Sequence, residues 1–210
     1  MFEVKNIFFS RGGKEVLSGV SFSVALGEVV AITGVNGVGK TTLLKVLAGI
    51  WFASSGRIVA DGVDAFSQPI RYRRRLGWLG EMSPAEDDLT VKAYLKYRAK
   101  LKGEQSRKIR HRVREAVAAC ALDEFIDAPI GRLSRGQRKR VAIAEAALLR
   151  PRLLLLDDPF AGLDAASREA VAGLIESFGA FASVVVTGHE VDVFARVAAR
   201  TLELKEGKIT

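Results

Sequence analysis

The chain has 210 residues, of which 49% are apolar and 27% charged, and this length suits one domain with a substantial buried core. No apolar run approaches the roughly 18 residues of a membrane-spanning helix, and residues 1–6 lack the basic-then-apolar pattern of a signal peptide. The single Cys120 cannot form an internal disulfide, so we expect a reduced cytoplasmic protein.

Positive charge exceeds negative charge along the chain. There are 32 Lys and Arg residues against 24 Asp and Glu, which gives a net charge of +8. The excess gathers at residues 71–75, 107–114 and 135–140. Nucleotide phosphates, nucleic acid or anionic lipid would each explain such clusters. A solvated basic face without a partner is the plain alternative.

The N-terminal part predicts short strands followed by a helix. Residues 21–26 alternate apolar and polar, as a half-buried strand does, and the β-branched run 29–33 fits a central strand buried on both faces. A glycine-rich loop follows. The next helix is expected from Lys40 to about Ala48, where Gly49 is a stop signal. Strand, glycine loop and helix in this order open a βα unit.

The glycine loop matches the phosphate-binding pattern G-x-x-x-x-G-K-[ST]. Its glycines allow backbone N–H groups to surround an oxyanion, and the following helix directs its positive end to the same anion. Lys40 is expected to reach the β- and γ-phosphates, and the Thr41 hydroxyl to bind Mg²⁺. The predicted phosphate-site residues are Gly34, Asn36, Gly37, Gly39, Lys40, Thr41 and Thr42. An ordinary glycine turn is the alternative.

The middle of the chain changes from strands to helices. Residues 57–60 and 76–79 are strand-like runs. Further on, Ile109, Val113 and Val117 recur at helical spacing among charged residues, which indicates an amphipathic helix. We therefore expect a helical lobe inserted into an α/β core.

The core resumes with the apolar strand 153–156, which ends at Asp157 and Asp158. A parallel strand ends at the ligand crevice, where one carboxylate can hold Mg²⁺ and the next can orient or deprotonate an attacking water. A helix cap is the alternative. Helices at 165–178 and 191–199 and a buried strand at 183–187 continue the alternation, and a mostly parallel sheet is predicted.

Residues 133–137 read LSRGQ at the start of a helix and resemble the LSGGQ signature of ABC ATPases. Other segments match that family's motifs in the expected order. They are the Walker A loop at 34–42, a Q-loop-like segment at 78–81, the Walker B strand at 153–158, a D-loop-like AGLD at 161–164 and a switch-histidine region at 187–189. The resemblance covers essentially the whole chain.

The resemblance implies the fold and its division. The expected fold is an α/β P-loop NTPase (RecA-like) core with a mostly parallel sheet, an N-terminal antiparallel β subdomain and an inserted helical subdomain. In a single ABC ATPase domain spanning 1–210, the core takes residues 1–81 and 151–210. The helical subdomain takes residues 82–150 and carries the signature.

The resemblance also implies head-to-tail pairing of two ATPase domains. Ser134, Gly136 and Gln137 of one subunit would then close over the ATP bound by the other, and Asp164 would link the two sites. His189 would contact the γ-phosphate and the attacking water. The implied catalytic residues are Lys40, Glu81, Asp158 and His189, and the implied metal ligands are Thr41, Glu81 and Asp157. A structural histidine and a polar helix cap at residues 133–137 are the alternatives.

Some positions depart from the family pattern. Asp158 stands where a catalytic glutamate is usual, so hydrolysis is expected to be slow. Glu81 replaces the usual Q-loop glutamine, and Arg135 replaces a signature glycine. Arg11 falls where an aromatic ring stacks on adenine. Phe9, on the same face of the strand, could substitute, or the Arg11 guanidinium could stack itself.

The implied function is that of the ATP-binding, ATP-hydrolysing subunit of an ABC transporter, with ATP and Mg²⁺ as its ligands. The expected partners are a second ATPase subunit, identical to this chain, and an integral membrane subunit, with no nucleic acid. The chain would lie on the cytoplasmic, inner face of the cell membrane. Its short length resembles compact export-type ATPases, such as those of cytochrome c maturation.

Two alternatives remain. The first is a soluble ABC-type ATPase acting on nucleic acid or ribosomes, which would explain the basic clusters. The second is a small P-loop kinase, which has no use for residues 133–137. Cargo does not follow from the sequence, because cargo recognition belongs to the membrane partner.

Overall fold

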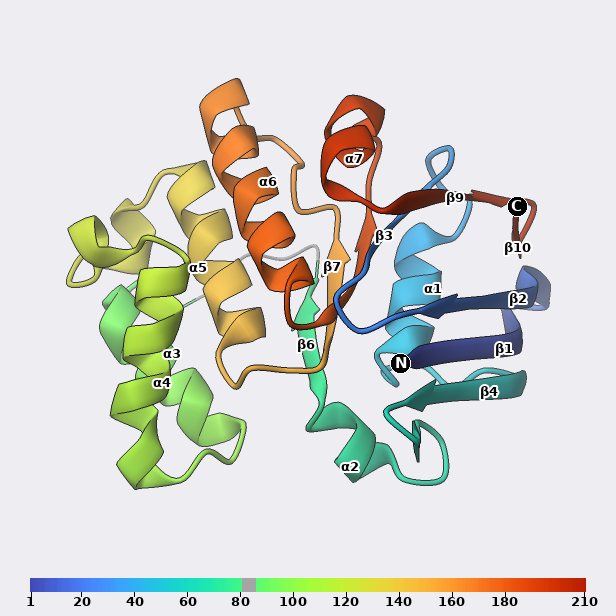
Figure 1. The fold of residues 1–210 in the computed structure, drawn as a ribbon, viewed down its shortest axis with the longest axis horizontal. Coiled ribbons are helices and arrows are strands. Elements are labelled where there is room, and N and C mark those ends of the chain that lie inside the picture. Colours follow the sequence, from blue (N-terminus) through green and yellow to red (C-terminus); the bar gives the residue numbers. More distant parts are fainter. Residues whose placement is uncertain (81–85) are drawn as a thin grey trace.

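The computed structural model describes residues 1–80 and 86–210, and Figure 1 shows how their helices and strands are arranged. The strands are β1 (Phe2–Arg11), β2 (Lys14–Val24), β3 (Val29–Thr33), β4 (Ser55–Ala60), β5 (Val63–Asp64), β6 (Leu76–Leu79), β7 (Leu153–Asp157), β8 (Ser183–Thr187), β9 (Arg200–Lys205) and β10 (Lys208–Ile209). The α-helices are α1 (Lys40–Leu47), α2 (Pro69–Arg73), α3 (Val91–Leu101), α4 (Ser106–Ala119), α5 (Arg135–Ala147), α6 (Ala165–Gly179) and α7 (Val191–Val197).

The central sheet has six strands in the order β10-β9-β3-β8-β7-β6. All neighbouring pairs are parallel except the terminal hairpin of β9 and β10. Strands β7 and β8 are buried along their whole length, as expected for strands with helices on both faces. Successive side chains of β7 point to opposite faces of the sheet and therefore belong to two different apolar cores. Leu155 packs with α1, whereas Leu154 and Leu156 pack with α5 and α6.

The second sheet is antiparallel, with the order β2-β1-β4-β5. It packs against α1, which lies between the two sheets (Figure 1). Strand β1 is irregular, because Asn6 has a φ of 50° and the pairing register shifts between Val4 and Ile7. The irregularity matters for the site, since β1 continues beyond it to Phe9 and Arg11.

The helices α3, α4 and α5 gather at one side of the parallel sheet, away from the antiparallel sheet (Figure 1). Helix α4 buries Ile109, Val113 and Val117, the residues whose spacing predicts its amphipathic face. These side chains belong to the same apolar core as α6 and the adjoining face of the sheet. The helices are therefore packed onto the core through a continuous apolar contact.

The predicted fold class is confirmed, with corrections at the element ends. The strand expected at 21–26 is the end of β2, which stops at Val24, because Glu28 accepts a 2.6 Å hydrogen bond from the Ala25 N–H and Gly27 turns the chain at φ 85°. Helix α7 stops at Val197, since the Ala199 N–H bonds to the carbonyl of Val29. Within the described ranges no helix is long and apolar enough to cross a membrane.

Candidate functional site

Residues that follow β3, β7 and β8 meet at one edge of the parallel sheet, around a cavity of about 270 Å³. The cavity is lined by Asn36, Gly37, Gly39, Lys40, Thr41, Thr42, Asp157, Asp158, Thr187 and His189. The pairing of β7 with β8 sets Asp157 opposite Thr187. The fold thus brings together the predicted phosphate loop, the acidic strand end and His189. Glu81 lies outside the described residues.

The phosphate loop has a backbone that only glycine adopts without strain. Gly34 has a φ of 146°, and a Cβ there would lie 2.5 Å from the carbonyl oxygen of Leu204. Gly39 precedes α1 with a φ of 115°, and no side chain of the described residues caps the helix. The first turn of α1 also holds no acidic residue. Its backbone N–H groups and positive dipole end are therefore available to an anion.

Lys40 folds back over this loop. Its ammonium group donates to the carbonyl oxygens of Gly34 at 2.7 Å and Val35 at 3.2 Å, and Nζ lies 3.2 Å from Nε2 of His189. Burial lowers the pKa of Lys40, while the charges of Asp157 and Asp158 act in the opposite direction. A cation held among carbonyl groups at a helix N-terminus is well placed to exchange these contacts for phosphate oxygens.

The Asp157 carboxylate is fixed on one side and open on the other. Its Oδ1 accepts hydrogen bonds from the hydroxyls of Thr187 at 2.8 Å and Thr41 at 3.2 Å. Its Oδ2 is buried and has no hydrogen-bond partner in the described part of the chain. A hydroxyl and a carboxylate with an unused oxygen form the hard oxygen environment that Mg²⁺ prefers, with phosphates and waters completing its shell. Thr41 and Asp157 fit that ion.

Asp158 has an unusual backbone and a partly desolvated side chain. Its φ is 46°, its N–H bonds to the Thr187 carbonyl at 3.1 Å, and its Oδ1 is buried without a partner among the described residues. Burial raises the pKa of this carboxyl, and the charge of Glu190 raises it further, whereas His189 and Lys139 oppose the shift. A partly dehydrated carboxylate beside the cavity can accept a proton from water.

Lys139 is a member of the site that sequence reasoning missed. It lies on α5, is 8% exposed, and donates from Nζ to the carbonyl oxygen of Asp158 at 3.4 Å. Burial lowers its pKa. The position of Lys139 in the sequence does not indicate its contact with Asp158, because that contact depends on how α5 packs against the end of β7. The sequence indicates Thr187 only as part of the histidine segment, and the bond of Thr187 to Asp157 likewise depends on strand pairing.

The signature residues lie apart from this cavity. Ser134 begins α5 with a capping box, in which its hydroxyl accepts from the Gln137 N–H at 3.2 Å and Gln137 Oε1 accepts from the Ser134 N–H at 2.9 Å. A Cβ on Gly136 would lie 2.2 Å from the Ser167 hydroxyl of α6. Asp164 caps α6 by accepting from the Ser167 N–H at 2.8 Å. Within one chain Ser134, Gln137 and Asp164 cap helices, Gly136 packs against Ser167, and none of the four lines the cavity.

Arg11 and Phe9 belong to a separate shallow cavity of about 300 Å³. Trp51 also lines it. Phe9 is buried and stacks on the Trp51 ring at 5.5 Å, while the Arg11 guanidinium lies 4.6 Å and the Lys45 ammonium 4.9 Å from the centre of that ring. Sequence reasoning missed Trp51, although a tryptophan just after the stop signal of a phosphate-loop helix was the available clue.

Comparison with known proteins points to one family. A family model described as ABC transporter matches residues 17–161. The nickel import ATP-binding protein NikO of Rhodobacter capsulatus is 33% identical over 226 residues, covering 99% of this chain and 87% of the relative. The cytochrome c biogenesis ATP-binding export protein CcmA of Cupriavidus pinatubonensis is 36% identical over 171 residues, covering 81% and 75%.

Other relatives are longer. The sulfate/thiosulfate import ATP-binding protein CysA of Methylococcus capsulatus is 33% identical over 213 residues, but the chain spans only 61% of its length. Among solved structures, cbiO1 of Clostridium perfringens, part of the ABC transporter complex cbiONQ, superposes with a TM-score of 0.87 at 29% identity, covering 100% of this chain and 86% of that one. A dimeric bacterial ABC transporter cassette gives 0.86 at 26%, covering 100% and 96%.

Proposed function

Because this chain belongs to the ABC transporter family, we propose that it binds and hydrolyses ATP and thereby powers a separate membrane subunit. One observation carries the proposal. An uncapped helix N-terminus, a lysine, a hydroxyl–carboxylate pair and a histidine converge on one cavity at the edge of the sheet. These groups can hold a polyphosphate and a divalent cation and can assist the attack of water on a phosphate.

In this proposal the phosphates lie on the phosphate loop at the start of α1. Lys40 releases the carbonyl groups of Gly34 and Val35 and binds β- and γ-phosphate oxygens. Thr41 and Asp157 hold Mg²⁺, which neutralises phosphate charge when bound. Asp158 orients the attacking water and accepts its proton, and His189 donates to the γ-phosphate. Glu81 is proposed as a further ligand near the metal.

The position of the signature supports pairing with a second copy. Ser134, Gly136, Gln137 and Asp164 are absent from the lining of the chain's own cavity. A similar solved structure is a dimeric ABC transporter cassette, and another is a dimer bound to ADP and phosphate. We propose that these residues face the nucleotide of the partner. Such a dimer would then bind an integral membrane subunit at the inner face of the membrane.

Some residues of the basic clusters are already engaged within the chain. Arg112 pairs with Glu104 and Glu115, and Arg138 pairs with Asp87. Lys139 is buried. Charges already neutralised within the chain are poor phosphate contacts for DNA or RNA. Relatives are named for both import and export, so the proposal assigns neither direction.

ATP titration of the purified chain tests the nucleotide site. Lys40→Ala should weaken ATP binding at least about tenfold, the loss expected for a hydrogen bond to a charged phosphate. The matched control is Lys92→Ala, because Lys92 is exposed and pairs with Asp127 at 3.5 Å on the helical side. Equal ATP affinity of the parent and Lys40→Ala would contradict the proposal.

A pull-down from detergent-solubilised membranes tests the transporter role. We expect the tagged chain to recover a polytopic membrane protein in stoichiometric amount. Recovery of ribosomes or nucleic acid without a membrane protein would instead support the soluble alternative.

A further inference from the structure

A second cavity, of about 460 Å³, lies between α4, the turn from α5 to β7 and the end of α6. Most of its lining is apolar, including Ala116, Ala119, Leu148, Phe178 and Phe181, and the charged residues Glu115, Arg150 and Arg152 also line it. Phe178 is 2% exposed and stands edge-on to Phe181, a residue that is 44% exposed. An exposed phenylalanine beside a hollow with mostly apolar walls can remove apolar surface from water by binding an apolar group.

The cavity lies at the edge of the sheet opposite to the nucleotide site. Arg152 precedes β7 and Phe181 precedes β8, whereas Asp157 and Thr187 end these strands at the other edge. Each strand has five residues, a span of about 16 Å. A ligand in this cavity would therefore be distinct from ATP.

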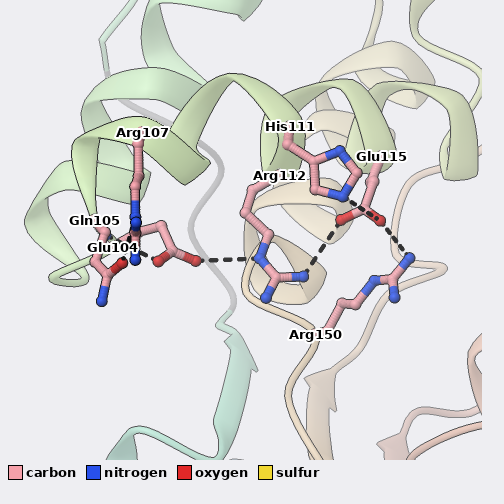
Figure 2. Close-up of polar contacts among 7 residues, drawn as sticks. All are labelled: Glu104, Gln105, Arg107, His111, Arg112, Glu115 and Arg150. Atoms are coloured by element: carbon pink, nitrogen blue, oxygen red, sulfur yellow. Dashed lines mark hydrogen bonds and ion pairs between the residues drawn. The ribbon is translucent and has the colours of Figure 1, made fainter.

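Arg150 and Arg152 line the cavity. Arg150 is at one end of a chain of ion pairs along α4 (Figure 2). Arg150 bonds to Glu115, which also accepts from Arg112 at 3.3 Å and lies 3.2 Å from His111. Arg112 in turn bonds to Glu104 at 3.1 Å. The position of Arg150 is thus set by its bond to Glu115, a carboxylate that Arg112 and His111 also contact.

Arg152 is more weakly paired with a carboxylate than Arg150 is. Its Nε lies 3.9 Å from Asp61, a long contact, and its side chain is 58% exposed. The same carboxylate also pairs with the N-terminal ammonium at 3.0 Å and with Arg75 at 3.5 Å. One carboxylate shared among three cations leaves positive charge beside the cavity, which favours an anionic group there.

From this juxtaposition we propose that the cavity binds a small amphiphilic anion, a molecule with one apolar group of aromatic size and one carboxylate. The apolar group packs on Phe178, Phe181 and Leu148, and the carboxylate binds Arg152. The volume is within the range of small-molecule sites. A docked protein would need about 20–30 residues on each side, and eleven of the described residues line this cavity.

Calorimetric titration of the full chain with 4-phenylbutyrate and with its neutral analogue 4-phenylbutanamide tests the proposal. We expect a dissociation constant of about 1 mM for the carboxylate, as is usual for a ligand of this size, and about fivefold weaker binding of the amide. Arg152→Gln should abolish the difference between the two ligands. Arg110→Gln is the matched control, because Arg110 is an exposed arginine of α4 outside the cavity lining, and it should leave both affinities unchanged.

A second variant tests the location. Ala119→Trp should fill the cavity and weaken binding of 4-phenylbutyrate at least about tenfold, while ATP affinity stays at the parent value. Absence of binding, equal binding of acid and amide, or unchanged binding in Ala119→Trp would each overturn the proposal. Binding of N-acetyl-Phe-Asp-amide more than tenfold tighter than 4-phenylbutyrate would assign the cavity to a protein partner and overturn it as well.

Discussion

At the scale of single residues, Asp158 carries the sharpest expectation for catalysis. Its carboxylate is one methylene shorter than that of the usual glutamate, and a displacement of about 1 Å from the attacking water can lower the rate on the order of 100-fold. We therefore expect Asp158→Glu to raise kcat for phosphate release at saturating ATP. Asp158→Asn is the control and should lower it. A glutamate variant no faster than the parent would refute the geometric explanation.

Trp51 provides the second prediction at this scale. Its ring, with Arg11 and Lys45 against it, is the aromatic surface of the shallow cavity at the end of β1. If adenine stacks there, Trp51→Ala should weaken ATP binding about tenfold, the usual magnitude for loss of one stacked base. Tripolyphosphate has no base, so its affinity should not change. An equal loss for both ligands would point to a distorted phosphate loop instead.

At the scale of elements, two glycines differ in the space around them. Gly77 packs closely against another backbone, whereas Gly173 does not. A Cβ on Gly77 of β6 would lie 2.3 Å from the carbonyl oxygen of Ala146 on α5, and neither backbone can move away easily. A Cβ on Gly173 of α6 would meet nothing within 4 Å. Strand β6 therefore depends on glycine in order to lie beneath α5, whereas α6 does not depend on Gly173.

We expect Gly77→Ala to lower the free energy of unfolding by about 1–3 kcal/mol or more, because it overpacks the contact between sheet and helix. Gly173→Ala should instead raise it by about 0.5–1 kcal/mol, through the better helix propensity of alanine. Urea denaturation of both variants measures the two values. Equal and small effects would show that α5 can shift away from β6.

At the scale of the whole molecule, Glu145 connects α5 to α3. Its carboxylate accepts hydrogen bonds from the Tyr94 hydroxyl at 2.7 Å and from Arg98 Nε at 2.9 Å, and it pairs with Lys102 at 3.3 Å. Burial alone would raise the pKa of Glu145, but the charge of Lys102 and the bonds from Tyr94 and Arg98 outweigh it and hold the pKa below its usual value.

A carboxyl with a lowered pKa stabilises the fold above its unfolded-state pKa, and that stability is lost as the pH falls through the folded-state pKa. We expect the free energy of unfolding of the parent to decline below about pH 4.5. Glu145→Gln should be less stable at pH 7 by about 1–3 kcal/mol and should decline less steeply in acid. Parallel curves for parent and variant would show that other carboxyls control the acid response.

The sequence alone determined whatever depends on neighbours along the chain. The glycine loop, the apolar strand with its two aspartates, the amphipathic period of α4 and the helix start at Ser134 are local patterns, and the alternation of strands and helices led to the confirmed fold class. The proposed phosphate site at residues 34–42 is local for the same reason, because one loop and one helix end build it.

Only the tertiary structure decided which distant side chains meet. Thr187 reaches Asp157 because β7 and β8 pair in parallel, Lys139 reaches the end of β7 because α5 packs on the sheet, and Trp51 folds between Phe9 and Arg11. The same is true of Arg152, which shares Asp61 with the chain's first residue. Such contacts depend on strand order and helix packing, which are set by burial across the whole chain and have no local signal.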